Sequence, residues 1–102
     1  RETTLSLDCA VLLCNRAACY LALGTPQFAF ADTHRCCDSQ FEWPKVLYRL
    51  SVSLEALKDF ENAERILEQA ILQPSVLAEM KPKMEARLAL IKEAAKKDKI
   101  AM

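Results

Sequence analysis

The pattern of apolar positions along this 102-residue chain has the spacing of α-helices almost throughout. Apolar residues recur every three or four positions, which places them on one face of a helix, and there is almost no strand-like alternation. The pattern predicts helices at about 4–23, 25–39, 44–58, 60–72 and 81–99. The predicted fold class is therefore all-α.

Glycine and proline mark where these helices begin and end. Gly24 is the single glycine of the chain and follows the first helix. Thr25 then offers a capping hydroxyl, and Pro26 stands at a first helical position, where proline is favoured. Pro44 can start the third helix in the same way. Pro82 would cost about 3 kcal/mol inside a helix, so we expect the last helix to begin just before it.

The sequence is similar to itself after a shift of 34 residues. Aligned positions match in size: Leu13 with Leu47, Ala17 with Ser51, Ala29 with Ala63, and Cys36 with Ala70. A helix pair has an apolar face that it cannot bury alone, and small residues let neighbouring helices approach closely. We therefore predict a single domain over 1–102 made of antiparallel helix-turn-helix repeats at about 4–40 and 44–73, followed by a capping helix at 76–99.

The repeat resembles a known family. Its second unit has apolar and small residues at tetratricopeptide repeat (TPR) spacing: Leu47, Leu50, Ser51, Leu54, Ala63 and Leu67. The stretch from Asn15 to Gly24 is also typical of TPR proteins. The chain thus resembles a TPR pair with its capping helix, a fragment of an α-solenoid. Because such solenoids usually need at least three repeats, we expect a fragment of a larger protein that self-associates to some degree.

Charge and apolar content narrow the class of partner. Lysine plus arginine and aspartate plus glutamate each number 14, so the net charge is zero and we expect no nucleic-acid partner. No apolar run approaches the roughly 18 to 20 residues that cross a bilayer, so we expect no membrane partner either.

The cysteines and the single histidine offer little chemistry. The five cysteines are an odd number without Cys-x-x-Cys spacing: Cys9, Cys14, Cys19, Cys36 and Cys37. We expect all five to pack between helices in a reducing compartment, the cytoplasm or alternatively the nucleus. His34 stands without any phosphate loop, nucleophile elbow or His-Glu-x-x-His motif. We therefore expect no catalytic residue, metal or cofactor, and no enzyme activity.

One group of polar residues calls for an explanation. Lys45 and Arg49 lie four residues apart on one helical face, an arrangement of like charges that costs about 0.2–0.5 kcal/mol. No acid lies three or four positions from Arg49 within its helix. Asn15 stands at the position equivalent to Arg49 in the preceding repeat. In a TPR stack these three residues would face one concave groove.

The same residues resemble those of carboxylate-clamp TPR domains. In that family an Asn of one repeat and a Lys and an Arg of the next hold the last residue of heat-shock chaperone tails ending in Glu-Glu-Val-Asp. The resemblance implies that Asn15 and Lys45 bind the terminal carboxylate, while Arg49 binds the aspartate side chain or an upstream acid. The apolar floor for the peptide would consist of Val11, Ala18, Tyr48 and Val52.

This clamp is partial, because a full one also takes a Lys and an Asn from a further upstream repeat. We therefore predict weak peptide binding, no tighter than tens of micromolar. The alternative is a TPR scaffold that binds another protein segment, or assembles a larger protein, without clamp recognition.

Overall fold

The structure, a computed structural model, describes residues 7–38, 43–73 and 78–101. These residues form five α-helices and no strand: α1 (Leu7–Ala22), α2 (Pro26–Asp38), α3 (Pro44–Ala56), α4 (Phe60–Ile71) and α5 (Lys81–Ala101). The all-α class is confirmed, and α2, α3, α4 and α5 begin where the prolines and the apolar pattern predict. The predicted boundaries at 4, 39–40 and 76 lie outside the described residues. Within the described ranges, no helix is long and apolar enough to cross a membrane.

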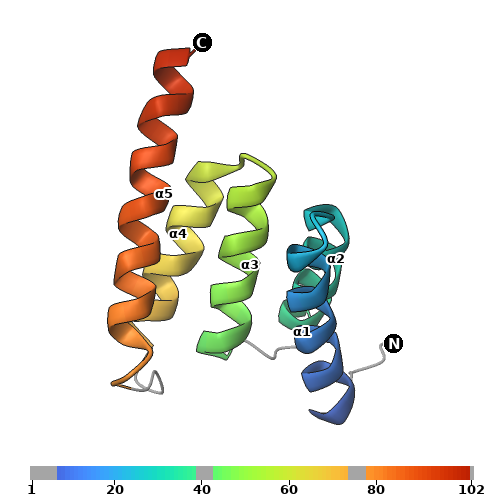
Figure 1. Cartoon of the computed structure of the whole chain (residues 1–102). Helices are drawn as coiled ribbons and strands as arrows, with labels where there is room; N and C mark the ends of the chain where they lie inside the picture. The colour runs from blue at the N-terminus through green and yellow to red at the C-terminus, as the bar shows by residue number, and fades with distance from the viewer. Residues whose placement is uncertain (1–6, 39–42, 74–77, 102) are drawn as a thin grey trace.

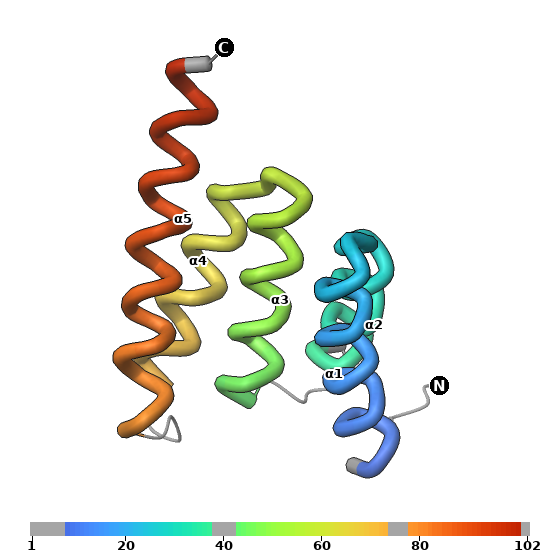
Figure 2. Tube along the Cα trace, in the orientation of Figure 1, coloured from blue at the N-terminus to red at the C-terminus, as the bar shows by residue number. Residues whose placement is uncertain are grey.

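Successive helices run in opposite directions, and the pair α1 and α2, the pair α3 and α4, and α5 follow one another in a row (Figures 1 and 2). Each helix packs on the next along the chain, and α1 also touches α3. The row begins with α1 and α2 and ends with α5, and the molecule measures 44 × 29 × 24 Å. The arrangement is the predicted one, antiparallel helix-turn-helix repeats with a C-terminal helix that covers the last repeat.

The two turns within the repeats have the same backbone geometry. Gly24 and Lys58 follow α1 and α3 and have left-handed φ values of 78° and 67°. The N–H of each donates to the carbonyl three residues earlier, at 3.2 Å for Gly24 and 2.9 Å for Lys58. The next N–H donates to the carbonyl five residues earlier, at 2.9 Å in both turns. Since Gly24 and Lys58 are aligned by the 34-residue shift, the sequence repeat is also a structural repeat.

Helices α2 to α5 start where the sequence predicts, but the contacts at their N-termini differ from one helix to the next. Before α2, the Thr25 hydroxyl donates to the Tyr20 carbonyl at 3.1 Å and ties the turn to the end of α1. The start of α3 has no side-chain capping bond, and Pro44 occupies its first turn. Asp59 caps α4 by accepting from the N–H of Asn62.

The small residues of the repeat are fully buried in the packed helices. Ala17 and Ser51, and likewise Ala29 and Ala63, are 0% exposed. The main core lies between α3, α4 and α5 and consists of Leu47, Leu50, Leu54, Ala63, Leu67, Ala70, Met84 and Ile91. A second cluster joins α1 and α2 to α3 and consists of Ala10, Cys14, Cys36 and Val46. These interfaces explain why the helices form one row.

The prediction that all five cysteines pack between helices is wrong for two of them. Cys14 and Cys36 are buried and Cys37 is half-buried, but Cys9 and Cys19 are exposed. The reason is their position on α1, whose inner side carries Ala10, Cys14 and Ala17. None of the five cysteines forms a disulfide.

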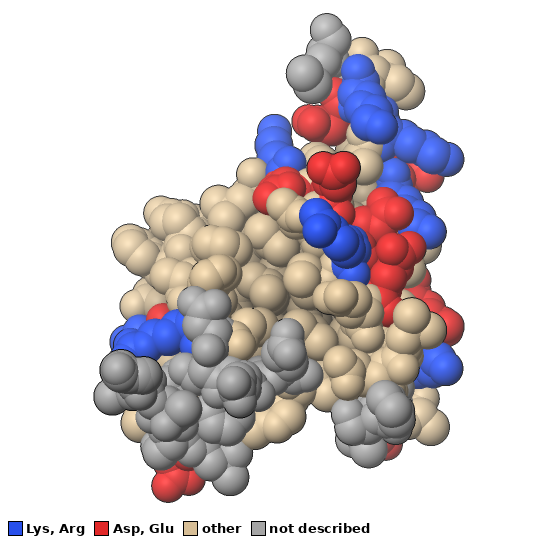
Figure 3. All heavy atoms as spheres, turned by 180° about the vertical axis from the view of Figure 1, so that it is seen from behind, with Lys and Arg blue, Asp and Glu red and all other residues tan. Residues whose placement is uncertain are grey.

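Charged side chains of both signs are interspersed over the α4 and α5 end of the molecule, as Figure 3 shows from behind. One pair joins the two helices, Lys92 Nζ and Glu68 Oε2 at 3.8 Å, with both side chains about half exposed. An exposed pair of this kind contributes about 0–1 kcal/mol. This surface is a solvated face.

Candidate functional site

A groove of about 370 Å³ lies between α3 and the start of α5. Its lining residues are Lys45, Tyr48, Arg49, Glu79, Met80, Lys83 and Met84. Three of these side chains are cationic and one is acidic, and the remaining three are largely apolar. The groove therefore combines a net positive charge with an apolar floor, a combination that attracts acidic segments.

The two lysines of the groove are available to a ligand. The side chain of Lys45 is exposed and forms no ion pair or hydrogen bond with another side chain in the described ranges. The Nζ of Lys83 lies 5.4 Å from the centroid of the Tyr48 ring, a cation–π distance. Neither lysine is neutralised by an acid of the described chain, so both can meet a carboxylate.

Arg49 is partly occupied within the protein. Its Nη1 donates to the backbone carbonyl of Cys14 at 2.5 Å and lies 3.5 Å from the Cys14 sulfur. This bond ties α3 to α1. Because a carbonyl carries no net charge, this bond does not neutralise Arg49, which keeps its positive charge at the groove. One nitrogen of its guanidinium, Nη1, is occupied by the bond.

The remaining predicted site residues do not line this groove. Asn15 is exposed on α1, directly after Cys14, and Val11 is 43% exposed on the same face of α1. Ala18 and Val52 are half-buried. Arg49 reaches from α3 to α1 and also lines the groove, whose other lining residues belong to α3 and to residues 79–84. The groove thus brings together Lys45, Tyr48 and Arg49 and leaves out the other four.

A network between α3 and α5 stands beside the groove. Arg87 Nη1 of α5 donates to Glu55 Oε1 of α3 at 3.3 Å. Burial lowers the pKa of the Arg87 guanidinium, but its interactions with Tyr48 and Glu55 outweigh burial, so the pKa lies above its ordinary value. These contacts hold α5 against α3 and restrict Tyr48.

Sequence reasoning missed the contribution of α5 to the groove. Lys83 and Met84 are neighbours in the chain, and Met80 precedes Lys83 by one turn. The apolar stripe of α5 identifies the buried side, and Lys83 stands at the edge of that stripe. The position of Lys83 at this edge was the sequence signal that it borders a helix interface. Only the docking of α5 shows which groove Lys83 lines.

A second polar contact joins α1 to α2. Arg16 donates from Nε and Nη2 to the two carboxylate oxygens of Asp32, both at 2.8 Å. The side chain of Asp32 is only 8% exposed, whereas that of Arg16 is 55% exposed. Hydrogen bonding and attraction to Asp32 raise the pKa of Arg16 above its ordinary range. This pair satisfies a buried carboxylate and is structural.

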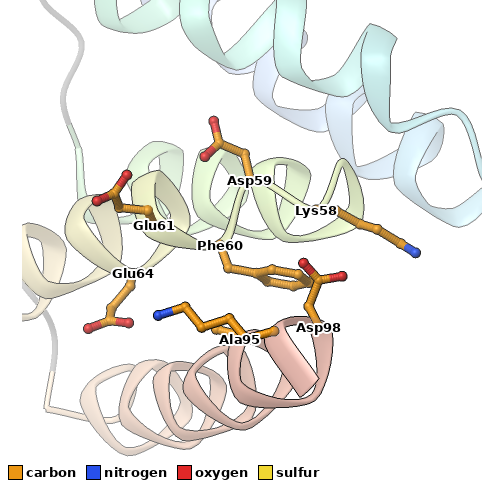
Figure 4. A pocket seen from close by; sticks show the side chains of 8 residues that line it. Lys58, Asp59, Phe60, Glu61, Glu64, Ala95 and Asp98 are labelled. Atoms are coloured by element: carbon orange, nitrogen blue, oxygen red, sulfur yellow. The ribbon is translucent and has the colours of Figure 1, made fainter. Parts of the chain in front are cut away.

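A larger hollow, of about 420 Å³, lies between the α3–α4 turn and the C-terminal part of α5. Figure 4 shows the Phe60 ring reaching from the start of α4 toward Asp98 and Ala95 of α5. The rim mixes four acids with two lysines, and one of the acids, Asp59, already caps α4. The acids of this rim outnumber its lysines, whereas the α3–α5 groove brings together Lys45, Tyr48 and Arg49, so the α3–α5 groove is the candidate site.

Comparison with known proteins adds one relative. No family model and no solved structure matches the chain. The ER protein translocation subcomplex subunit sec67 of Schizosaccharomyces pombe is 31% identical over 65 residues, which are 64% of this chain and 34% of that protein. The match thus covers about a third of the length of that curated relative.

Proposed function

We propose that this chain is a TPR-like protein-interaction module that binds an acidic segment of a partner protein in the groove between α3 and α5. The observation that carries the proposal is the set of three cations, Lys45, Arg49 and Lys83, around one apolar floor. Complementary charge draws an acidic chain to such a groove, and apolar contacts with Tyr48 and the methionines hold it.

Assembly with another protein is also what the relative's name describes. Sec67 is named as a subunit of a translocation subcomplex, and a helical-repeat module without catalytic groups suits such a role. Under this proposal the chain is not an enzyme and works by binding.

The second candidate is the carboxylate clamp for heat-shock chaperone tails. It is favoured by one observation, that Lys45 and Arg49 line the same groove. The Arg49 bond to Cys14 and the place of Asn15 outside the groove favour the general module over the clamp. The two candidates differ in whether the ligand needs a free C-terminal carboxylate.

Titration with one peptide in two forms separates them. A peptide ending in Glu-Glu-Val-Asp is measured by calorimetry with its C-terminus free and amidated. The general module predicts that both forms bind with similar dissociation constants, no tighter than tens of micromolar, and that added salt weakens both. Loss of binding on amidation would instead establish the clamp. If neither form binds, both candidates are wrong.

Variants locate the bound peptide. We expect Lys45→Ala and Lys83→Ala each to weaken binding about three- to tenfold, because each removes one partner of a carboxylate. Lys96→Ala is the matched control, since Lys96 is also exposed on α5 but lies outside the groove. An equal effect of Lys96→Ala would show that only net charge matters and would contradict the site.

A further inference from the structure

The α3–α5 groove holds its cations close together around one aromatic ring. Lys45 precedes Tyr48 by one turn of α3, and Arg49 follows Tyr48 directly. From the other side of the groove, Lys83 Nζ lies 5.4 Å from the centroid of the Tyr48 ring. All four residues line the same groove. The three positive charges are therefore gathered at one place instead of being spread along the surface.

The protein itself does not balance these cations. Glu79 is the single acid among the lining residues, so the cations exceed the acids by two. The ion pairs between described side chains include none with Lys45, Arg49 or Lys83. Lys45 and Arg49 also repel each other, because they lie four residues apart on one helix. An excess of two positive charges at one place matches a group that carries two negative charges.

Tyr48 keeps this arrangement in place. Arg87 of α5 interacts with Tyr48 and donates to Glu55 of α3 at 3.3 Å. Because Glu55 balances Arg87, the Tyr48 ring is held without a further unpaired charge at the groove. The cation–π contact then places Lys83 beside the ring. Cations that are held in place before the ligand arrives bind an anion at a smaller entropic cost.

A phosphate monoester suits this group of cations better than a single carboxylate does. At pH 7 a phosphorylated serine carries a charge of about −1.5 to −2 on three acceptor oxygens, whereas a glutamate carries a single charge. Arginine binds phosphate through its planar guanidinium, and lysine binds it as a point charge. One phosphate can therefore balance two cations at once, which one carboxylate cannot.

We propose that the α3–α5 groove binds an acidic protein segment that carries a phosphorylated serine or threonine, with the phosphate between Lys45, Arg49 and Lys83. This inference rests on the proposed function, since it names the chemistry of the acidic segment. The half-buried side chains of Tyr48 and Met80 favour a phosphate carried by a polypeptide over a free anion, because they offer apolar contacts to neighbouring residues of the segment.

Three forms of one peptide test the phosphate. The peptide Glu-Glu-Leu-X-Leu-Glu-Glu, with both ends blocked, carries at X a serine, a phosphoserine or two successive glutamates. The last two forms have nearly the same net charge at about pH 7.5 and differ in whether two charges sit on one group. We expect calorimetry to show that the phosphoserine form binds at least about tenfold tighter than the two-glutamate form, with the serine form weakest.

The pH dependence gives a readout specific to phosphate. The second pKa of phosphoserine is about 6, so lowering the pH from about 7.5 to about 5.5 should reduce the advantage of the phosphoserine form. The charged residues that line the groove are Lys45, Arg49, Lys83 and Glu79. Histidine is the side chain that ordinarily changes charge in this range, and His34 is not among the lining residues. The two-glutamate form should therefore bind nearly equally at both pH values.

Variants locate the phosphate. Lys45→Ala and Lys83→Ala should each reduce the ratio of affinities between the phosphoserine and two-glutamate forms, since each removes a cation beside the phosphate. Lys96→Ala, on α5 outside the groove, should leave this ratio unchanged. All three lysines are exposed, so circular dichroism should show unchanged helix content.

The outcomes separate this inference from the proposed function. Equal binding of the phosphoserine and two-glutamate forms would overturn the inference and leave the proposed function standing. If no form binds, the proposed function is wrong and the inference falls with it. A loss on Lys96→Ala as large as that on Lys83→Ala would place the phosphate elsewhere and overturn the inference as well.

Discussion

At the scale of single residues, two polar side chains, half-buried Arg49 and buried Asp32, find their partners in another helix. Arg49 has no acid within reach in its own helix and donates to the Cys14 carbonyl of another helix. Asp32 is buried, and Arg16 satisfies it from α1 with two bonds. Both contacts cross between helices, so each residue stabilises the association of elements more than its own helix.

The thiols give a residue-scale prediction. Burial, reinforced by Cys14 and Asp32 nearby, raises the pKa of the Cys36 thiol above its ordinary value of 9.0. Since the thiolate is the reactive form, iodoacetamide at about pH 8 should modify exposed Cys19 at least about tenfold faster than buried Cys36. Peptide mass spectrometry measures both rates.

The protection of Cys36 should depend on pH in a defined direction. The raised pKa keeps the Cys36 thiol neutral in the folded protein at pH values below 9.0, the ordinary pKa, so its protection from iodoacetamide is complete there. This protection falls as the pH rises toward the higher pKa of the folded protein. In urea, which unfolds the protein, the modification rates of Cys19 and Cys36 should converge. Equal rates in the folded protein would contradict the burial of Cys36.

At the scale of elements, the turns show how one local geometry is made from two different sequences. The first turn has Gly24 at its left-handed position, and the second has Lys58 there. Glycine adopts positive φ without strain, whereas other residues pay about 1–2 kcal/mol. The second turn therefore holds strain that the first does not.

This difference predicts opposite effects of two substitutions. Lys58→Gly should raise the free energy of unfolding by about 1 kcal/mol, and Gly24→Ala should lower it by about 1 kcal/mol. No atom lies within 4 Å of a Cβ added at Gly24, so that loss reflects backbone strain alone. Urea unfolding measures both variants. A loss of stability on Lys58→Gly would show that its side chain contributes more than the strain costs.

At the scale of the whole molecule, stability comes from contacts between neighbours in the row. Each helix packs mainly on the helices next to it in the chain, and α5 covers the end of the second repeat with Met84 and Ile91. In such a solenoid the stability is close to a sum of terms from repeats and from neighbouring interfaces. A substitution that removes packing at one end of the row should therefore destabilise the helices at that end most.

Ile91 provides the test. It is 0% exposed, so Ile91→Ala should lower the free energy of unfolding by about 2–5 kcal/mol. Leu90→Ala, at a position 57% exposed, should change it by no more than about 0.5 kcal/mol. Amide hydrogen exchange should show that Ile91→Ala reduces protection in α3, α4 and α5 more than in α1 and α2. Equal loss in all helices would mean that the row unfolds as one unit.

For the residues that the structure describes, the sequence by itself determined the all-α class, the five helices, most of their starts and the 34-residue repeat. These follow from local rules, because helical periodicity, proline and glycine act within a few residues of each position. It also placed Lys45, Tyr48 and Arg49 on one helix, and the structure lines one groove with all three. The exposure of Cys9 and Cys19 was missed, since it depends on which side of α1 has a neighbour.

Only the tertiary structure decided which partners the polar residues have and where the groove opens. Arg16 pairs with Asp32 across 16 residues, and Arg49 reaches Cys14 across 35 residues. Such separations have no signature in a periodic pattern, because they depend on how one helix is rotated and shifted against the next. The docking of α5 likewise adds Lys83 and the methionines to the groove, since the angle between packed helices is set by side-chain shape over the whole interface.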